Sequence, residues 1–271
     1  NKGYYTSKYY SQRAENHTGY AYHNHESTRT DNLELTSKYN VNVKDHRIDV
    51  LGGYSYQYNV IDGFNANNYD YLNDFYLYNN LGVGAALKEG KAGMGSYKND
   101  NTLIGFFGRV SYGYANKYNA LISVRHEGSS KFGANHKWGT FPSVSLGWTI
   151  SNEEFMKGLT WLDHLKLRAG YGVTGVIPKD PYLSLTKYKL GESYYYENGE
   201  WKPGLEVESN PNPDLKWEKS AEFNFGLDIS VLGDRLGASI DVFTKKTTDL
   251  LWEFDVPAPP NLYPRTLANV G

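Results

Sequence analysis

The chain has 271 residues with no Cys and 25 Tyr, and its 28 basic and 30 acidic residues give a formal charge of −2. The absence of Cys excludes disulfides, thiolate metal sites and cysteine nucleophiles, and the balanced charge disfavours binding to nucleic acid. No apolar run reaches the roughly 18–20 residues that a membrane-spanning helix requires. Strands of a membrane barrel escape this test, because only alternate side chains face lipid and the hydropathy of each strand averages out.

Alternating apolar and polar residues begin at Leu33, a pattern typical of β-strands with one apolar face. The apolar positions are mostly odd from Leu33 to Val43 and mostly even from Ile48 to Tyr58, with a tight turn expected at Lys44-Asp45 between them. This change of parity across a short polar break predicts the first β-hairpin.

The second hairpin has the clearest pattern in the chain. Apolar, aromatic or Gly residues occupy the even positions of 104–114 and 118–124, on either side of a turn at Asn116-Lys117. The opposite face carries Arg109, Arg125 and Glu127. A dry core cannot hold so many charges without partners, so we expect water to reach this face.

Two further hairpins follow with the same period. The third joins positions 144–150 to 165–173 through residues 151–161, and it places Lys166 and Arg168 on its polar face. The fourth joins residues 217–229 to 236–242 through Gly233-Asp234. Each strand spans about ten residues or more, which is the length that a tilted strand needs to cross a bilayer.

The predicted connections differ in length between the two ends of the strands. Three of the connections at one end are short and residues 151–161 are somewhat longer, whereas those at the other end cover residues 59–101, 128–140 and 175–214. Outer-membrane barrels have short periplasmic turns and long external loops, and a soluble sandwich has no reason for this asymmetry. The sequence therefore predicts an all-β, antiparallel transmembrane β-barrel that crosses a bacterial outer membrane several times. A soluble or surface-anchored glycan-binding β-sandwich is the alternative.

Gly170, Gly172 and Gly175 match the dinucleotide-binding fingerprint G-x-G-x-x-G and follow a predicted strand. That fingerprint must open a helix whose N-terminus holds the pyrophosphate. Here Pro178 and Pro181 follow without helical period. We expect these glycines to bend a strand that leaves the barrel rim.

Other patterns carry little weight. His23-Asn24-His25 places two imidazoles on one strand face, but no third metal ligand is identifiable. Glu153-Glu154 and Asp163 could suggest a glycosidase carboxylate pair, but the sequence gives no evidence of the separation that this chemistry requires. They lie beside a presumed periplasmic turn. Residues 16–18 match the N-glycosylation acceptor pattern, which means little in a bacterial protein. We predict no catalytic, cofactor or metal site.

The expected long loops hold two groups of aromatic residues: Tyr194-Tyr195-Tyr196 with Trp201, and Phe132, Trp138 and Phe141. Aromatic faces beside polar groups suit contact with sugar rings or peptide side chains. Packing of the loops on one another explains the rings equally well. The candidate ligand contacts are Tyr194, Tyr195, Tyr196, Trp201 and Trp138.

Several segments in order resemble SusC/RagA-type TonB-dependent transporters, and the resemblance covers most of residues 33–271. The segments are Gly108-Arg109-Val110-Ser111-Tyr112, Lys117-Tyr118, Arg125-His126-Glu127-Gly128-Ser129-Ser130-Lys131-Phe132-Gly133, Trp138-Gly139-Thr140-Phe141-Pro142-Ser143, residues 165–175, Asn212-Pro213-Asp214-Leu215-Lys216-Trp217-Glu218-Lys219, residues 247–251 and Asn269-Val270-Gly271. One departure is His126-Glu127, where the family usually has Arg or a similar residue followed by Asp.

The resemblance implies a 22-stranded barrel closed by an N-terminal plug, covered outside by a SusD-like lipoprotein and energised through TonB. On this reading residues 1–271 are a portion of the barrel with about nine or ten strands, without the plug or the TonB-contacting box. The implied function is TonB-dependent import of an oligomeric nutrient, either a glycan or an oligopeptide, without enzymatic activity.

The resemblance also implies roles for the charged residues of the polar face. Those expected to face the lumen, where they contact the plug or line the ligand path, are Arg109, Arg125, Glu127, Lys166 and Arg168. Plug contact is the role we favour. A passive porin is the nearest alternative in fold, and it would support uptake without TonB.

Overall fold

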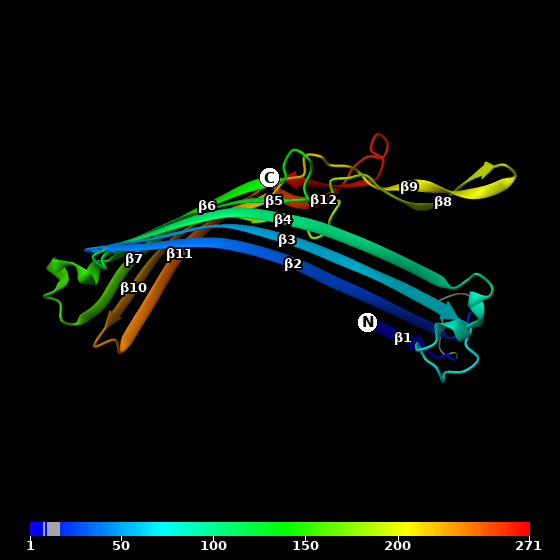
Figure 1. Cartoon of the computed structure of the whole chain (residues 1–271), viewed down its shortest axis with the longest axis horizontal. Coiled ribbons are helices and arrows are strands. Elements are labelled where there is room, and N and C mark those ends of the chain that lie inside the picture. Colours follow the sequence, from blue (N-terminus) through cyan, green and yellow to red (C-terminus); the bar gives the residue numbers. More distant parts are fainter. Residues whose placement is uncertain (8, 10–16) are drawn as a thin grey trace. The chain divides into compact units, whose positions relative to one another are not determined.

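The computed structural model describes residues 1–7, 9 and 17–271 (Figure 1). Asn16 of the acceptor pattern at residues 16–18 lies outside the described residues. The described chain contains thirteen β-strands and four short 3-10 helices. Within these ranges, no helix is long and apolar enough to span a bilayer.

Nine strands form one sheet in which neighbours follow chain order, except that β10 pairs with β7. The strands are, in sheet order, β1 (Lys2–Thr6), β2 (Tyr20–Val43), β3 (His46–Tyr69), β4 (Gly93–Tyr114), β5 (Tyr118–Ser129), β6 (Trp138–Thr149), β7 (Leu162–Val176), β10 (Glu218–Val231) and β11 (Leu236–Thr248). Two separate hairpins pair β8 (Lys187–Glu197) with β9 (Glu200–Ser209) and β12 (Leu250–Asp255) with β13 (Arg265–Val270).

The chain divides into two compact units, one made of residues 1–31 and 58–101 and the other of residues 32–57 and 102–271. In the first unit the loop after β3 contains the 3-10 turns η1 (Leu81–Val83) and η2 (Ala85–Leu87). The buried Asn68 amide donates to the carbonyls of Leu81 at 2.7 Å and Gly84 at 2.8 Å. Tyr71 is also buried, and burial raises its pKa to about 12. Polar contacts therefore fix this loop at its base.

The predicted short turns are confirmed, but the predicted boundaries of two long loops are wrong. β3 continues to Tyr69 and β4 begins at Gly93, so the loop expected at residues 59–101 covers only residues 70–92. Residues 59–69 carry polar side chains on both faces, such as Asp62 and Asn65, so they show no regular alternation. Strand pairing nevertheless needs only backbone hydrogen bonds. The loop expected at residues 175–214 contains the β8–β9 hairpin.

The register in the second unit confirms the two predicted faces of the sheet. One row across consecutive strands aligns apolar side chains, at Val110, Ile122, Val144, Tyr171 and Phe223. The next row faces the other way and aligns small or polar residues at Arg109, Ser123, Ser143, Gly172, Glu222 and Lys245. The apolar row is exposed, with Ile122 58% accessible, so the sheet presents its apolar side outward instead of enclosing it.

The buried hydrophobic cluster of the second unit lies among the loops. Phe132, Phe141, Leu215 and Trp217 pack together, with the rings of Phe132 and Trp217 4.8 Å apart. The indole Nε1 of Trp217 donates to the carbonyl of Lys137 at 3.0 Å. We call these four aromatic and aliphatic residues the loop core. Two of the aromatic residues proposed as ligand contacts or packing groups, Phe132 and Phe141, therefore have the packing role.

Three asparagine side chains tie the loop core to the β12–β13 hairpin. Asn210 donates to the carbonyls of Tyr263 and Arg265, at 2.7 and 2.9 Å. Asn212 donates to Leu267 at 2.8 Å. From the hairpin, the side chain of Asn269 donates to the carbonyls of Lys216 and Asp249 and accepts from the amide of Lys216. We refer to Asn210, Asn212 and Asn269 as the asparagine clamp.

The glycine fingerprint lies inside a continuous strand. Gly170, Gly172 and Gly175 belong to β7 and pair with Asn224, Glu222 and Lys219 of β10, in that order. A Cβ on Gly175 would come within 2.2 Å of the Phe141 ring. The missing side chain at Gly175 therefore leaves room for Phe141. The nucleotide-binding interpretation is excluded, because residues 177–186, which the structure describes, form no helix after β7.

Candidate functional site

A network of charged side chains lies on the polar face of the sheet, around Arg168 of β7. Its Nε and Nη2 donate to the two carboxylate oxygens of Asp228 at 2.7 and 2.9 Å, which is the bidentate arrangement that guanidinium and carboxylate favour. Its Nη1 lies 3.1 Å from Oδ1 of Asp241. The Ser239 hydroxyl donates to Asp228 at 2.6 Å. The network fixes three strands, β7, β10 and β11, to one another through their side chains.

A second charged pair, formed by two residues of β5, lies on the same face and contacts β3 and β4. Nη2 of Arg125 donates to Oε1 of Glu127 at 2.6 Å and to the Ser55 hydroxyl at 3.2 Å. The guanidinium carbon lies 5.7 Å from the centre of the Phe107 ring. The pair places one positive and one negative group on a surface that water reaches.

Of the charged residues selected from the sequence, the structure brings Arg125 and Glu127 together. Arg109 lies opposite Ser123, and Lys166 lies opposite Asp228. The two carboxylates that bind Arg168, Asp228 and Asp241, were not among the predicted site residues, because the register between strands cannot be read from one strand. The sequence did show that both carboxylates occupy polar positions in strands with a two-residue period.

A polar groove of about 350 Å³ lies on this face over the glycines of β7. Its lining residues are mostly hydroxyl, amide or charged, and they are Ser143, Val144, Ser145, Gly170, Tyr171, Gly172, Thr174, Ser220, Glu222, Asn224 and Lys245. A Cβ on Gly172 would lie 3.4 Å from that of Ser143. The absence of side chains on the glycines thus helps to keep the groove open. Its walls offer both hydrogen-bond donors and hydrogen-bond acceptors.

The β8–β9 hairpin presents an apolar face to solvent. Tyr196 pairs with Trp201, and Tyr194 pairs with Pro203, which puts these side chains on one side. The rings of Tyr196 and Trp201 are 5.3 Å apart, and Trp201 is 69% exposed. Tyr195 pairs with Lys202 and therefore belongs to the other side. The structure thus separates Tyr195 from the other aromatic residues of this candidate site.

Trp138 occupies a different position from the hairpin aromatics. It stacks on His126, with ring centres 4.8 Å apart and planes at 7°, and lies 6.2 Å from Phe106. By strand alternation it shares the apolar face with Val144 and Leu146. This setting suits an aromatic girdle at the membrane interface better than contact with a polar ligand.

The carboxylates near the short turns have structural partners. Glu153, between the 3-10 turns η3 (Ile150–Asn152) and η4 (Glu154–Met156), accepts from the Tyr118 hydroxyl at 2.6 Å, Lys117 Nζ at 2.9 Å and Trp148 Nε1 at 3.1 Å. Asp163 accepts from the backbone amides of Gly233 and Asp234 at 2.7 and 3.0 Å. Through these hydrogen bonds Glu153 and Asp163 hold the turns in place, a structural role that the sequence did not predict.

We predict that the Glu153 contacts stabilise the protein in a pH-dependent way. The Tyr118 and Lys117 hydrogen bonds lower the pKa of Glu153 from its ordinary value of 4.5 to about 2. Because the folded-state pKa is the lower one, the contribution is complete above about pH 4.5 and is lost as the pH falls towards 2. In thermal unfolding of the full-length protein in detergent, the difference in Tm between wild type and Glu153→Gln should shrink over that range.

Glu154→Gln is the matched control, because Glu154 is exposed and pairs with Lys157. Its Tm should stay closer to that of the wild type than the Tm of Glu153→Gln at neutral pH. A Tm difference for Glu153→Gln that does not change between pH 2 and 7 would contradict the prediction.

The histidines at positions 23 and 25 form no metal site with other described residues, among which no group of three His, Asp or Glu side chains is placed to hold an ion. His25 Nδ1 lies 2.5 Å from Oδ1 of Asn1, and the His23 ring lies 6.0 Å from that of Tyr78.

A sheet of long strands with an exposed apolar face and a charged face defines the class of transmembrane β-barrel proteins. Comparison with known families makes the assignment specific: the family described as "TonB dependent receptor-like, beta-barrel" matches residues 1–271. The chain belongs to this family and is an outer-membrane protein. A soluble or surface-anchored β-sandwich is thereby ruled out, and the relatives are named as receptors and importers instead of enzymes.

Three relatives show the extent of the similarity. The TonB-dependent receptor P3 of Formosa agariphila is 36% identical over 239 residues, which cover 88% of this chain and 23% of that protein. The TonB-dependent receptor SusC of Bacteroides thetaiotaomicron is 38% identical over 189 residues, which cover 65% of this chain and 18% of that protein. A RagAB peptide importer in a "closed-closed" state matches with a TM-score of 0.82 and 26% identity, covering 93% of this chain and 27% of that one. The chain thus spans about a quarter or less of the curated relatives.

Proposed function

We propose that the full-length protein imports an oligomeric nutrient, a glycan or an oligopeptide, across the outer membrane with energy supplied through TonB. Residues 1–271 supply a portion of its barrel, and the plug and the TonB-contacting box belong to other parts of the protein. The observation that carries the proposal is the division of one sheet into an apolar face and a face with fixed ion pairs, in a chain of this family.

In this proposal the polar face lines the lumen. The ion pairs of Arg125 with Glu127 and of Arg168 with Asp228 leave the wall nearly neutral, and the groove over Gly170 and Gly172 offers donors and acceptors. Such a wall hydrogen-bonds a plug or a polar oligomer without holding either through a large net charge. Arg109 and Lys166 extend the same face.

The proposed partner outside the cell is a SusD-like lipoprotein that covers the barrel mouth and encloses the ligand. The RagAB importer is described in "closed-closed" and "open-open" states, and we propose that the cover of this protein opens and closes likewise. The apolar side of the β8–β9 hairpin, with Tyr194, Tyr196 and Trp201, is our candidate for ligand contact at that mouth.

Uptake measurements in the native host test the proposal. Deletion of the full-length gene should abolish accumulation of at least one labelled oligosaccharide or oligopeptide, and deletion of TonB should do the same because import needs its energy. Unchanged accumulation of every oligomer after gene deletion would overturn the proposed import. Uptake that survives loss of TonB would indicate a passive porin.

The hairpin provides its own matched control. Replacing Tyr194, Tyr196 and Trp201 together with Ser should lower uptake at least tenfold. Removing an aromatic side chain that stacks on a ligand costs about 1–3 kcal/mol per contact, the magnitude known for rings that stack on nucleic-acid bases. Tyr195→Ser, on the opposite side of the same hairpin, should change uptake less than twofold. If both variants showed equal uptake, the hairpin would not contact the ligand, but the proposed import function would still stand.

A further inference from the structure

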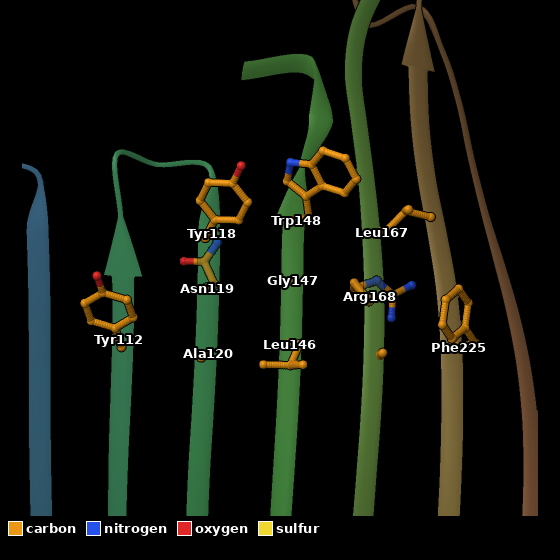
Figure 2. A pocket seen from close by; sticks show the side chains of 11 residues that line it. Tyr112, Tyr118, Asn119, Ala120, Leu146, Gly147, Trp148, Leu167, Arg168 and Phe225 are labelled. Atoms are coloured by element: carbon orange, nitrogen blue, oxygen red, sulfur yellow. The ribbon is translucent and has the colours of Figure 1, made fainter. Parts of the chain in front are cut away.

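A groove of about 330 Å³ lies on the apolar face of the sheet, near the short turns (Figure 2). Large and small side chains alternate along one row that crosses five strands, in the order Tyr112, Ala120, Leu146, Ala169 and Phe225. The methyl groups of the two alanines leave depressions on either side of Leu146.

A second row closes the groove towards the short turns. It aligns Tyr118, Trp148 and Leu167 on neighbouring strands, and Figure 2 shows the rings of Tyr118 and Trp148 at this end, on β5 and β6. The volume is within the range of about 300–1,000 Å³ that is typical of small-molecule sites. The strand segments at Asn119, Gly147 and Arg168 complete the lining.

The polar atoms of the aromatic lining already have partners. The Tyr118 hydroxyl and Trp148 Nε1 both donate to Glu153, and the Tyr112 hydroxyl lies 2.8 Å from Nδ1 of His46. The rings therefore present carbon atoms to the groove. An occupant gains dispersion contacts and loses no hydrogen bond to water if it is itself a hydrocarbon chain.

The membrane supplies such a chain, because the apolar face of this barrel contacts lipid. The adjacent charged groups indicate which kind of lipid fits. Lys117 Nζ and Oε2 of Glu153 lie 2.9 Å apart at the groove's end. A headgroup that carries both a phosphate and an ammonium matches this pair, with the phosphate beside Lys117 and the ammonium beside Glu153.

We propose that this groove binds one zwitterionic phospholipid of the periplasmic leaflet, with an acyl chain over Ala120 and Ala169 and the headgroup at Lys117 and Glu153. The leaflet follows from the short turns, which face the periplasm in outer-membrane barrels. The lipid fills a depression that would otherwise leave the lining without contacts on one side.

Native mass spectrometry of the delipidated full-length protein, titrated with phosphatidylethanolamine or phosphatidylglycerol, tests the site. The wild type should bind one phosphatidylethanolamine at least tenfold more tightly than further copies and more tightly than phosphatidylglycerol. Ala169→Phe and, independently, Ala120→Phe should weaken that first binding at least tenfold, because a ring occupies the space of the chain.

Ala238→Phe is the matched control, since Ala238 lies on the same apolar face, opposite Ile229, but outside the groove. It should leave binding of the first lipid within twofold of the wild type, with heat-modifiable gel mobility confirming that each variant is folded. Equal loss in Ala238→Phe, or folded groove variants that bind like the wild type, would overturn the site. Equal affinity for both lipids would overturn the assignment of the headgroup.

Discussion

Trp217→Ala should lower the free energy of unfolding of the full-length protein by about 3–5 kcal/mol, as is usual when a buried aromatic side chain is truncated. Trp217 is 3% exposed and contacts Phe132 and Phe141 in the loop core. The variant also loses the donor to the carbonyl of Lys137. Chemical unfolding in detergent gives the free energy, and limited proteolysis should show cleavage of residues 130–137 and 210–217 first.

The control for Trp217 is a second tryptophan of the same unit. Trp201 is 69% exposed, so Trp201→Ala should change stability by no more than about 0.5 kcal/mol, as surface substitutions generally do. If the two variants were equally stable, the loop core would not be a stabilising element.

Gly133→Val should destabilise the loop core by about 3 kcal/mol, at the upper end of the usual effect of overpacking. A Cβ at Gly133 would lie 1.8 Å from the carbonyl oxygen of Pro213 and 2.3 Å from its carbon. These are backbone atoms, so the contact is relieved only if one of the two loops moves. The hydrogen bond from the Gly133 amide to the carbonyl of Leu215, 3.2 Å long, would then break.

Gly52→Val is the comparison that isolates this effect. Gly52 lies in β3, and a Cβ there meets nothing within 4 Å. Valine also suits a strand, so the Tm of this variant should equal or exceed that of the wild type. A similar fall in Tm for both variants would show that the loss of glycine, and not the contact with Pro213, is responsible.

The strands could be predicted where one face is apolar and the other polar. The turns at Lys44-Asp45 and Gly233-Asp234 and the apolar row through Val110 and Ile122 follow directly from the two-residue period. Residues 59–69 have polar side chains on both faces, and for them the sequence carries no period even though the backbone continues as a strand.

The candidate site was less accessible to prediction, because it depends on which strands become neighbours. β10 pairs with β7, across the intervening β8–β9 hairpin, and this pairing brings Asp228 to Arg168. No local pattern specifies the register that aligns them. The aromatic side chains at positions 194–196 and 201 could be selected from the sequence. Only the strand pairing, in which Tyr195 lies opposite Lys202, shows that Tyr195 is on the other side of the hairpin from Tyr194 and Tyr196.

The run from Asn212 to Glu218, which contributes to the family resemblance, has a structural explanation. Leu215 and Trp217 fill the loop core, and Asn212 binds β13. Glu218 accepts from the amide of Leu251 at 3.1 Å. The side chains of this segment thus pack between loops or hydrogen-bond to them. An aromatic residue in a loop can therefore have a packing role instead of contacting a ligand.

The asparagine clamp has a consequence for how the loops respond to pH and salt. Its amide groups carry no charge, so acid does not titrate them and dissolved salt does not screen them. They also hold main-chain atoms at Tyr263, Arg265 and Leu267, which leaves the identities of those side chains unconstrained by the clamp. The base of the loops can therefore stay fixed when pH or salt concentration changes, while the side chains at Tyr263, Arg265 and Leu267 are free to vary.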